Sequence, residues 1–360
     1  MEIYVLNKNF EIIAMVDSYT SLIWTDRYYQ AGDFELYLPT SSEVLSILMP
    51  DYYLWNRDSE HLMIIEDIKT TSDVEEGNNL TVTGRSLESI LDRRIIWNRT
   101  ELSGSFQGVS GQNNGFWKIL NDNIMNPSTA SRQIPNFIFE YSDDPVITAL
   151  TIEAQYYGDN IYEVLTKVCQ EYHIGFKIIL NDQNQFVFSF YIGTDRSYVQ
   201  NTESFVVFSP NFENIVNSEY RETKSGYKNV VLVAGEGEGD QQKRTTAGDN
   251  ESTSLDRREM YFSSSAKKEG SDETYIAQLK ESGVEELKKY KIEKVIEGEV
   301  ETTKIFVYKE DYYMGDIVEL EDEYGRQSRT RVIEYVMNQD DSGFKSYPTF
   351  EVVDDEEDAS

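Results

Sequence analysis

Alternating apolar and polar residues predict β-strands in the N-terminal part of the chain. The segment Phe34–Leu38 alternates in this way until Pro39 ends it, so one face of the strand is apolar. The runs Tyr52–Trp55 and Leu62–Ile68 flank a short polar turn and predict a hairpin. We therefore expect a β-domain at the start of the chain.

The same domain is predicted to close with a strand and a short helix. In Leu80–Thr83, apolar residues alternate with threonines, and Gly84 breaks the pattern. Ser86 is placed to cap a helix over Leu87–Leu91, where Glu88 adds a negative charge that the first turn favours.

The middle of the chain changes from alternation to loops and helical spacing. The segment Trp97–Pro145 holds several glycines, asparagines and serines, which favour turns. We expect loops there, around one helix near Phe116–Met125.

The clearest helical pattern of the chain is Asp159–His173, whose apolar residues recur at helical spacing. Asp159 or Asn160 is a suitable N-terminal cap, and Gly175 is expected to end the helix. A hairpin is predicted to follow, with strands over Phe176–Leu180 and Phe186–Ile192.

Strand patterns resume in the C-terminal third. The polar, glycine-rich segment Gly235–Ser254 predicts an exposed loop that becomes ordered only on contact with a partner. Ser271–Tyr290 predicts a helix, and Tyr312–Val336 predicts a hairpin with a glycine-containing turn. Further strands are predicted over Phe205–Phe208, Val230–Val233 and Val300–Val307.

These patterns predict two β-domains separated by a mixed region. The expected parts are a first β-domain over residues 1–96, a middle α+β domain over 97–200, a second β-domain over 201–235 and 295–353, a loop-plus-helix insertion over 236–294, and an acidic tail over 354–360.

Composition supports a β-rich protein made in a reducing cytoplasm. The chain holds 25 Tyr and 17 Phe, residues that favour strands. Cys169 is the single cysteine, so no intrachain disulfide can form. No apolar run approaches the ~18 residues of a membrane span. The first residues carry no basic and apolar secretion signal, so we expect neither a span nor secretion.

The charge of the chain excludes one class of function. Its formal net charge is −32, and such a surface repels the phosphates of nucleic acids. Sequence-independent nucleic-acid binding is therefore excluded. The charge is compatible with a solubilising surface, or with a passage through which DNA slides without sticking.

The residues best suited to metal binding or nucleophilic catalysis are too few and too widely spaced. His61 follows a turn and is expected to be exposed, and His173 lies at the end of a helix. Cys169 lies beside the apolar stripe of the same helix and is predicted to be a small core residue. The three residues do not have the spacing of a zinc site, and no oxyanion-stabilising group accompanies Cys169 and His173.

The remaining motifs do not predict a catalytic or cofactor site. The glycine-rich Val230–Asp240 has the spacing G-x-G-x-G, and its carboxylates would repel a pyrophosphate, which excludes nucleotide binding. Carboxylate pairs such as Glu319 with Glu334 follow from the acidic composition alone. Asn98 and Asn250 begin glycosylation sequons without a sign of secretion. We predict no catalytic, cofactor-binding or metal-binding residue, and a protein that is not an enzyme.

Four stretches, in order, resemble the siphovirus tail-hub family of phages, prophages and phage-tail-like particles. They are SYTSLIWTDRYYQAGDFELYLP at Ser18–Pro39, TVTGRSLESILDRRII at Thr81–Ile96, the region from Tyr157–Ile178 to the corner YIGTDRS at Tyr191–Ser197, and Phe208–Gly239 together with the hairpin Tyr312–Val336.

This resemblance implies a β-rich α+β fold with two tail-tube-type β-barrels and an intervening mixed region, similar to contractile-tail baseplate hub proteins. It also implies a homotrimer in the virion that joins the sixfold tail tube to the threefold tail tip. The implied partners are the distal tail, tail tube, tape-measure and tail-tip or receptor-binding proteins, with DNA passing through without specific binding.

Two other functions stay open at this point. Related tail proteins can carry a peptidoglycan hydrolase domain after the hub region, although this chain ends just beyond the last hairpin. A carbohydrate-binding tail protein is the third reading, since exposed tyrosine and tryptophan stack on sugars. Aromatic residues spread this evenly are more often core and interface residues.

Overall fold

The computed structural model of the chain describes residues 1–73, 77–109, 114–237, 239, 242–268, 271–300 and 305–353. The chain divides into two compact units, Met1–Asn217 with Glu299–Ser360 and Ser218–Gly298. The predicted acidic tail lies outside the described residues.

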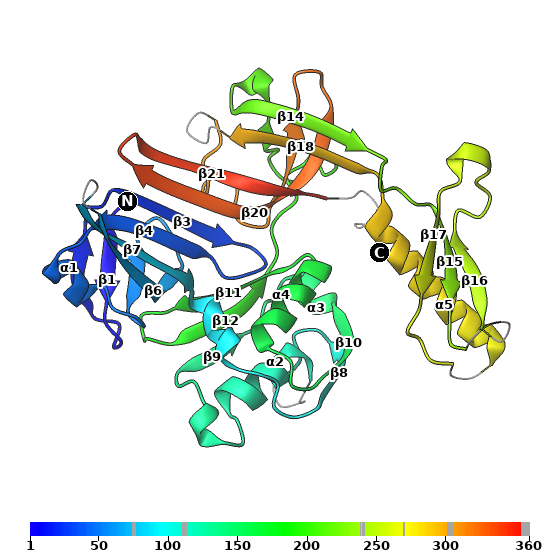
Figure 1. The fold of residues 1–360 in the computed structure, drawn as a ribbon, viewed down its shortest axis with the longest axis horizontal. Helices are drawn as coiled ribbons and strands as arrows, with labels where there is room; N and C mark the ends of the chain where they lie inside the picture. Colours follow the sequence, from blue (N-terminus) through cyan, green and yellow to red (C-terminus); the bar gives the residue numbers. More distant parts are fainter. Residues whose placement is uncertain are drawn as a thin grey trace. The chain divides into compact units, whose positions relative to one another are not determined.

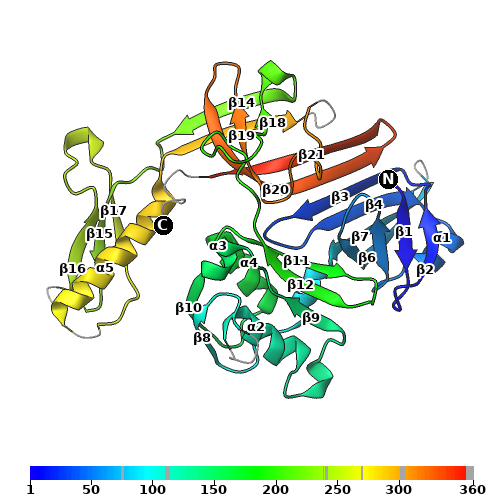
Figure 2. The same ribbon diagram turned by 180° about the vertical axis from the view of Figure 1, so that it is seen from behind.

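One eleven-stranded sheet organises the first unit (Figures 1 and 2). Its N-terminal strands are β1 (Ile3–Leu6), β2 (Ile12–Val16), β3 (Ser21–Arg27), β4 (Asp33–Pro39), β5 (Tyr53–Asn56), β6 (Leu62–Asp73) and β7 (Gly77–Ser86). Its C-terminal strands are β13 (Val207–Phe208), β19 (Ile317–Glu321), β20 (Gln327–Asp340) and β21 (Gly343–Val352). The order is β13-β19-β20-β3-β4-β7-β6-β5-β1-β2, with β21 paired to β20.

The long strand β20 joins the N-terminal and C-terminal strands. Its first residues pair antiparallel with β19, and its later residues, from Glu334 onward, pair antiparallel with β3. β21 runs along the opposite edge of β20, because Thr330 is paired with both Val318 and Val352. β19 and β3 therefore follow one another along one edge of β20.

This pairing differs from the prediction of two separate barrels. β20 extends beyond β19, and its second half pairs with β3, so strands assigned to two domains share one hydrogen-bonded sheet. No sheet within the described ranges closes on itself. The β-rich α+β class is confirmed, and the two closed barrels stay a prediction.

The predicted apolar faces form the core of this sheet. Phe34, Leu36 and Leu38 are buried together with Trp24 and Val82. The short segment α1 (Ser42–Ile47) follows β4 and is capped by the side chain of Ser41. The apolar residues of the alternating pattern therefore face the core, and the residues between them face the other side of the sheet.

A separate cluster of buried side chains fills the middle region. Its helix α4 (Ile161–Glu171) is capped by the side chain of Asn160, as predicted, and Gly175 starts the next strand instead of capping the helix. The other elements of this region are η1 (Leu87–Arg93), β8 (Thr100–Ser105), α2 (Gly115–Leu120) continued by η2 (Asn121–Met125), η3 (Ala130–Arg132), β9 (Phe137–Glu140), α3 (Pro145–Ala149), β10 (Thr151–Tyr156), β11 (Gly175–Leu180) and β12 (Phe186–Tyr191), and η4 (Pro210–Phe212) follows β13.

In the second unit, helix α5 (Asp272–Leu287) packs on a three-stranded sheet. The sheet contains β15 (Val230–Ala234), β16 (Arg244–Gly248) and β17 (Glu259–Ser263), while β14 (Ile215–Thr223) pairs with β18 (Glu293–Val300). Two single-turn helices complete it, η6 (Ser254–Asp256) and η7 (Lys288–Tyr290). The predicted helix Ser271–Tyr290 is confirmed.

Two predictions in this region were wrong. Gly235–Ser254 is not a loop throughout, because Arg244–Gly248 forms strand β16 beside β15. Thr245 and Thr246 favour a strand, a signal that the flanking glycines and charges concealed. Of the described residues in the strand predicted over Val300–Val307, only Val300 lies in a strand, as the last described residue of β18, and Ile305–Val307 are not in a strand. Residues 301–304 lie outside the described part.

Candidate functional site

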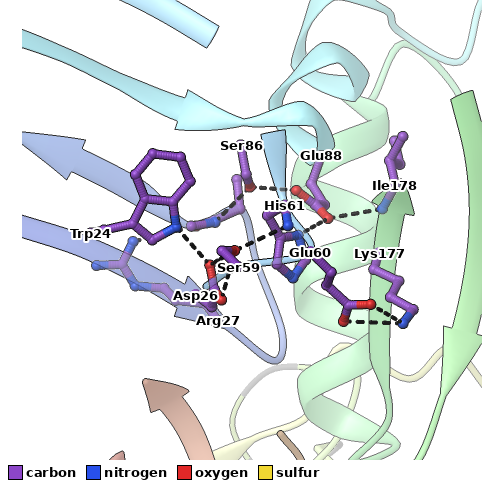
Figure 3. Close-up of polar contacts among 12 residues, drawn as sticks. Trp24, Asp26, Arg27, Ser59, Glu60, His61, Ser86, Glu88, Lys177 and Ile178 are labelled. Atoms are coloured by element: carbon purple, nitrogen blue, oxygen red, sulfur yellow. Dashed lines mark hydrogen bonds and ion pairs between the residues drawn. The ribbon is translucent and has the colours of Figure 1, made fainter. Parts of the chain in front are cut away.

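A buried ion pair between His61 and Glu88 is the centre of a polar network in the first unit (Figure 3). His61 is only 5% exposed and Glu88 only 1%, and the Nδ1 atom of His61 lies 3.1 Å from Oε1 of Glu88. The prediction that His61 is exposed was therefore wrong. The histidine follows a turn, but it directly precedes β6, and Glu88 of η1 draws its ring inward.

The Glu88 carboxylate also binds two groups besides His61. The backbone N–H of Ile178 in β11 donates to Oε1 over 2.8 Å, and the hydroxyl of Ser86 donates to Oε2. The Ser86 hydroxyl also accepts a 2.8 Å hydrogen bond from the N–H of Gly32. Ser86 precedes η1 as predicted, but its side chain does not cap the helix. Glu88 thus links the end of β7, and through Ser86 the residue that precedes β4, to β11.

A second buried carboxylate extends the network on the other side of His61. The Asp26 side chain accepts hydrogen bonds from the Ser59 hydroxyl, at 2.8 and 2.9 Å, and from Nε1 of Trp24 at 3.1 Å. The Ser59 hydroxyl in turn accepts the backbone N–H of His61 at 3.0 Å. Nearer the surface, Lys177 of β11 pairs with Glu60 at 3.0 Å.

The surrounding charges hold His61 in its cationic form. Burial lowers the pKa of the imidazole, but the charges of Glu88 and Asp26 and the hydrogen bond to Glu88 outweigh burial and raise it to about 9. For Glu88, burial raises the pKa, but the His61 charge and the donated hydrogen bonds lower it below its ordinary value overall. Both groups are therefore charged at neutral pH.

The stability that this pair contributes is expected to depend on pH. The pKa of His61 is raised from 6.5 to about 9, so its contribution is complete below pH 6.5 and is lost as pH rises through 9. The pKa of Glu88 is lowered from 4.5, so its contribution is present above pH 4.5 and is lost as pH falls through the lower folded value.

Between pH 6.5 and about 9.5, the free energy of unfolding should fall by roughly 3 kcal/mol relative to a His61→Gln variant. Urea unfolding at a series of pH values measures this difference. A His173→Asn variant, which removes the histidine outside the network, should keep the wild-type dependence. A constant difference between wild type and His61→Gln across this range would contradict the assignment.

The corner Gly193–Ser197 contacts the start of the C-terminal hairpin. Asp316 accepts hydrogen bonds from the N–H of Thr194 at 2.7 Å and from Nε of Arg196 at 2.7 Å. Its Oδ2 atom also accepts the N–H of Tyr313 at 3.0 Å. Burial raises the pKa of the Asp316 carboxyl, and these hydrogen bonds oppose the rise.

Tyr28 packs between three regions of the first unit. Its buried ring lies against Gly175 of β11 and Gly315 beside the hairpin, where an added Cβ would come within 2.5 and 2.4 Å of the ring, respectively. Gly315 also has φ +89°, a conformation that favours glycine. The N-terminal, middle and C-terminal stretches therefore meet at one side chain.

The surface of the first unit has an acidic groove of about 430 Å³ on strands β3, β4, β6 and β7. Arg85 is the only cation in its lining, and it binds Glu66 at 2.8 Å and Asp92 at 3.2 Å. The groove therefore repels anions. Across the described residues, no group of three or more His, Cys, Asp and Glu side chains is arranged to hold a metal ion.

The other residues considered from the sequence lie apart. Cys169 is fully buried in the core of the middle region, and burial raises the pKa of its thiol well above the ordinary value. His173 follows α4 with φ +53°. Glu334 binds Arg27 at 2.6 Å, whereas Glu319 lies opposite Arg329 in the strand register, so they do not form a carboxylate pair. Among the described helices, none has the length and apolarity of a membrane span.

The sequence analysis did not identify the His61–Glu88 pair or the Asp316 corner. The partners are separated by 27 residues in the first case and by 120 or more in the second, so local patterns carry no signal for them. The sequence did hold two short signals. One is a histidine and an acid, His61 and Glu88, within a β-rich segment, and the other is the sequence Gly-Thr-Asp-Arg at Gly193–Arg196.

Comparisons with known proteins assign the chain to a family. The sequence matches the family described as Siphovirus ReqiPepy6 Gp37-like protein over residues 2–350. No curated protein matches it significantly.

Solved structures with a similar fold and low sequence identity include two prophage tail proteins and a chain of a PdpA-VgrG complex. Prophage tail protein gp18 from Listeria monocytogenes EGD-e has a TM-score of 0.56 and 12% identity, covering 99% of this chain and 95% of that one. The 43 kDa tail protein of prophage MuSo2 from Shewanella oneidensis has a TM-score of 0.56 and 12% identity, covering 98% of each chain. A chain in the Francisella PdpA-VgrG complex has a TM-score of 0.51 and 10% identity, covering 97% of this chain and 57% of that one.

The chain belongs to the Siphovirus ReqiPepy6 Gp37-like family, and its fold is the one found in prophage tail proteins.

Proposed function

We propose that the chain is a structural subunit of a phage tail hub, located at the tail tip or baseplate of the virion and made in the cytoplasm of the bacterial host. The observation that carries this proposal is the family match over residues 2–350, together with a fold shared along nearly the whole chain with prophage tail proteins. The similar chain in the PdpA-VgrG complex supports a subunit that works within an assembly.

The interior of the first unit supports a role that depends on shape. The buried carboxyl groups of Glu88, Asp26 and Asp316 are used in contacts between distant segments. His61 is enclosed and cationic. These groups stabilise one arrangement of the N-terminal, middle and C-terminal stretches, which favours a scaffold. We include in the proposal that the chain is not an enzyme.

The proposed assembly is a homotrimer that joins the sixfold tail tube to the threefold tail tip. Two tube-type domains in each subunit, residues 1–96 and residues 201–235 with 295–353, would offer six similar surfaces to the tube. The proposed partners are the distal tail protein, the tail tube protein, the tape-measure protein and the tail-tip or receptor-binding proteins.

The distribution of charge supports passage of DNA without specific binding. Residues 218–298 contain 17 carboxylates and 14 lysines and arginines, a formal charge of −3. The remaining residues therefore carry −29 of the total −32. A conduit built from the first unit would repel phosphates along its length, so that DNA passes with little attraction.

Electron microscopy of particles that carry a C-terminal label on this chain tests the proposal. The label is expected at the distal end of the tail, and label distributed along the tail or missing from particles would contradict a hub. Zymography of the full chain on cell walls tests the alternative of a peptidoglycan hydrolase, and glycan-array binding tests a carbohydrate-binding tail protein. We expect neither activity.

A further inference from the structure

A cationic patch lies on the first unit of this strongly acidic chain. Residues 93–99, RRIIWNR, contain three arginines and no carboxylate, although the whole chain has 65 acidic and 33 basic residues. Arg132 at the end of η3 joins this segment. The Cζ atom of its guanidinium lies 4.8 Å from the centre of the Trp97 ring, and the group donates to the carbonyl of Ile95 at 2.8 Å. We call Arg94, Ile95, Trp97 and Arg132 the arginine–tryptophan patch.

The two arginines of this patch have no carboxylate partner within the described part of the chain. Arg94 donates to the backbone carbonyls of Arg132 and Arg93, both at 2.8 Å. Besides Ile95, Arg132 donates to Oδ1 of Asn123 at 3.3 Å. Partial burial and the charge of Arg94 lower the pKa of the Arg132 guanidinium below its ordinary value. Two like charges are thus held together without neutralisation, so carboxylates of a partner would stabilise them.

The patch also exposes large apolar side chains. Trp97 is 55% exposed and Ile95 is 39% exposed. Tyr157, 71% exposed, lies on the adjoining segment, where the N–H of Gly158 donates to the carbonyl of Ile96 at 2.9 Å. Tryptophan, tyrosine and arginine are the residues that contribute most to the energy of protein–protein contacts. Together with two unneutralised arginines, these side chains favour contact with a protein surface that presents carboxylates.

The acidic groove on β3, β4, β6 and β7 has the opposite charge. Its lining contains four carboxylates and one arginine, so its formal charge is −3. Two of the carboxylates pair with arginines of the same unit. The other two, Glu35 and Asp67, form no ion pair or side-chain hydrogen bond with any residue that the structure describes. They lie on either side of Thr83 in one row across β4, β7 and β6, and the row continues to the exposed Ile23 of β3.

Charge favours this groove as the counterpart of the patch. Two copies with a charge of −32 repel one another over most of their surfaces. Where the patch of one copy meets the groove of another, two arginines face two unpaired carboxylates and the interaction is attractive. The exposed Trp97 and Ile95 then meet Ile23, and the groove, at about 430 Å³, has room for large side chains.

We propose that the arginine–tryptophan patch of one copy of the chain docks into the acidic groove of a second copy. This inference rests on the proposed function, since it specifies a contact within the homotrimer. The interface is heterologous, because the two surfaces that meet are different. Both surfaces belong to the first unit, so each subunit uses its patch toward one neighbour and its groove toward the other.

Charge reversal in the full chain tests the contact, with self-association measured by analytical ultracentrifugation. Arg132→Glu should weaken self-association by roughly tenfold or more, because it places a further carboxylate against Glu35 and Asp67. Glu35→Arg should also weaken it, because the new cation faces Arg94 and Arg132. The direction of this second effect is informative. Glu35→Arg changes the net charge from −32 to −30, so relief of general repulsion alone would strengthen self-association.

The double variant and a matched control separate the contact from a folding defect. Arg132→Glu combined with Glu35→Arg keeps the net charge at −32 and exchanges the signs across the interface, so it should restore most of the lost association. A folding defect at residue 132 would not be repaired by a change at residue 35. Arg57→Glu makes the same charge change at an exposed residue of the first unit outside both surfaces, and it should leave self-association nearly unchanged.

Three results would overturn the contact. They are a chain that stays monomeric at tens of micromolar, an Arg132→Glu variant that associates as strongly as Arg57→Glu, and a double variant that associates as weakly as the single variants. If particles still carry the C-terminal label at the tail end in any of these cases, the hub proposal stands and only the proposed contact fails.

Discussion

Replacing Glu88 with alanine is expected to destabilise the protein by about 3–5 kcal/mol, the usual cost of removing one partner of a buried ion pair. The substitution leaves the His61 imidazole enclosed without its counter-charge and leaves the N–H of Ile178 without its carboxylate acceptor. Equilibrium urea unfolding at pH 6 measures the change, because both groups of the wild-type pair are charged at that pH.

A surface ion pair provides the matched control. Glu2 lies 3.3 Å from Arg57, and both side chains are more than half exposed. Glu2→Ala should change the free energy of unfolding by less than about 1 kcal/mol. If Glu88→Ala costs no more than Glu2→Ala, the network does not hold the N-terminal strands to β11.

Replacing Gly193 with alanine is the second change with a large expected effect. An alanine Cβ would lie 1.9 Å from the carbonyl carbon of Gly315 and 2.2 Å from the amide nitrogen of Asp316. Both atoms belong to the backbone, so a change of rotamer cannot relieve the overlap, and the corner must separate from the hairpin. We expect a loss of more than about 3 kcal/mol, beyond ordinary overpacking.

Gly226→Ala is the control for this prediction, because no atom lies within 4 Å of an added Cβ there. Neither glycine has a positive φ that alanine would find strained, so the comparison isolates the steric contact. The midpoints of urea unfolding for the two variants give the result. Similar midpoints would show that the corner is not packed against the hairpin as described.

Local features of the fold could be predicted because they depend on neighbouring residues. The alternation of apolar and polar residues identified the buried face of Phe34–Leu38. The helical spacing of apolar residues, together with the capping side chain of Asn160, identified the helix that follows it. The helix over Ser271–Tyr290 was found in the same way. Each depends on periodicity or on a side chain within a few residues of the backbone that it caps.

Features that depend on distant pairing could not be predicted in the same way. The register that lets β20 leave β19 and join β3 is set by residues more than 300 positions apart, and this pairing places strands of two predicted domains in one sheet. His61 was assigned to the surface because it follows a turn, whereas Glu88 and Asp26 fix it inside.

Cryo-electron microscopy of the distal tail end tests the central claim most directly. The account predicts three copies of this chain in a closed ring around the axis, between sixfold density above and threefold density below. Density for a single compact copy, or copies placed away from the axis, would contradict the claim that the chain works as a structural hub.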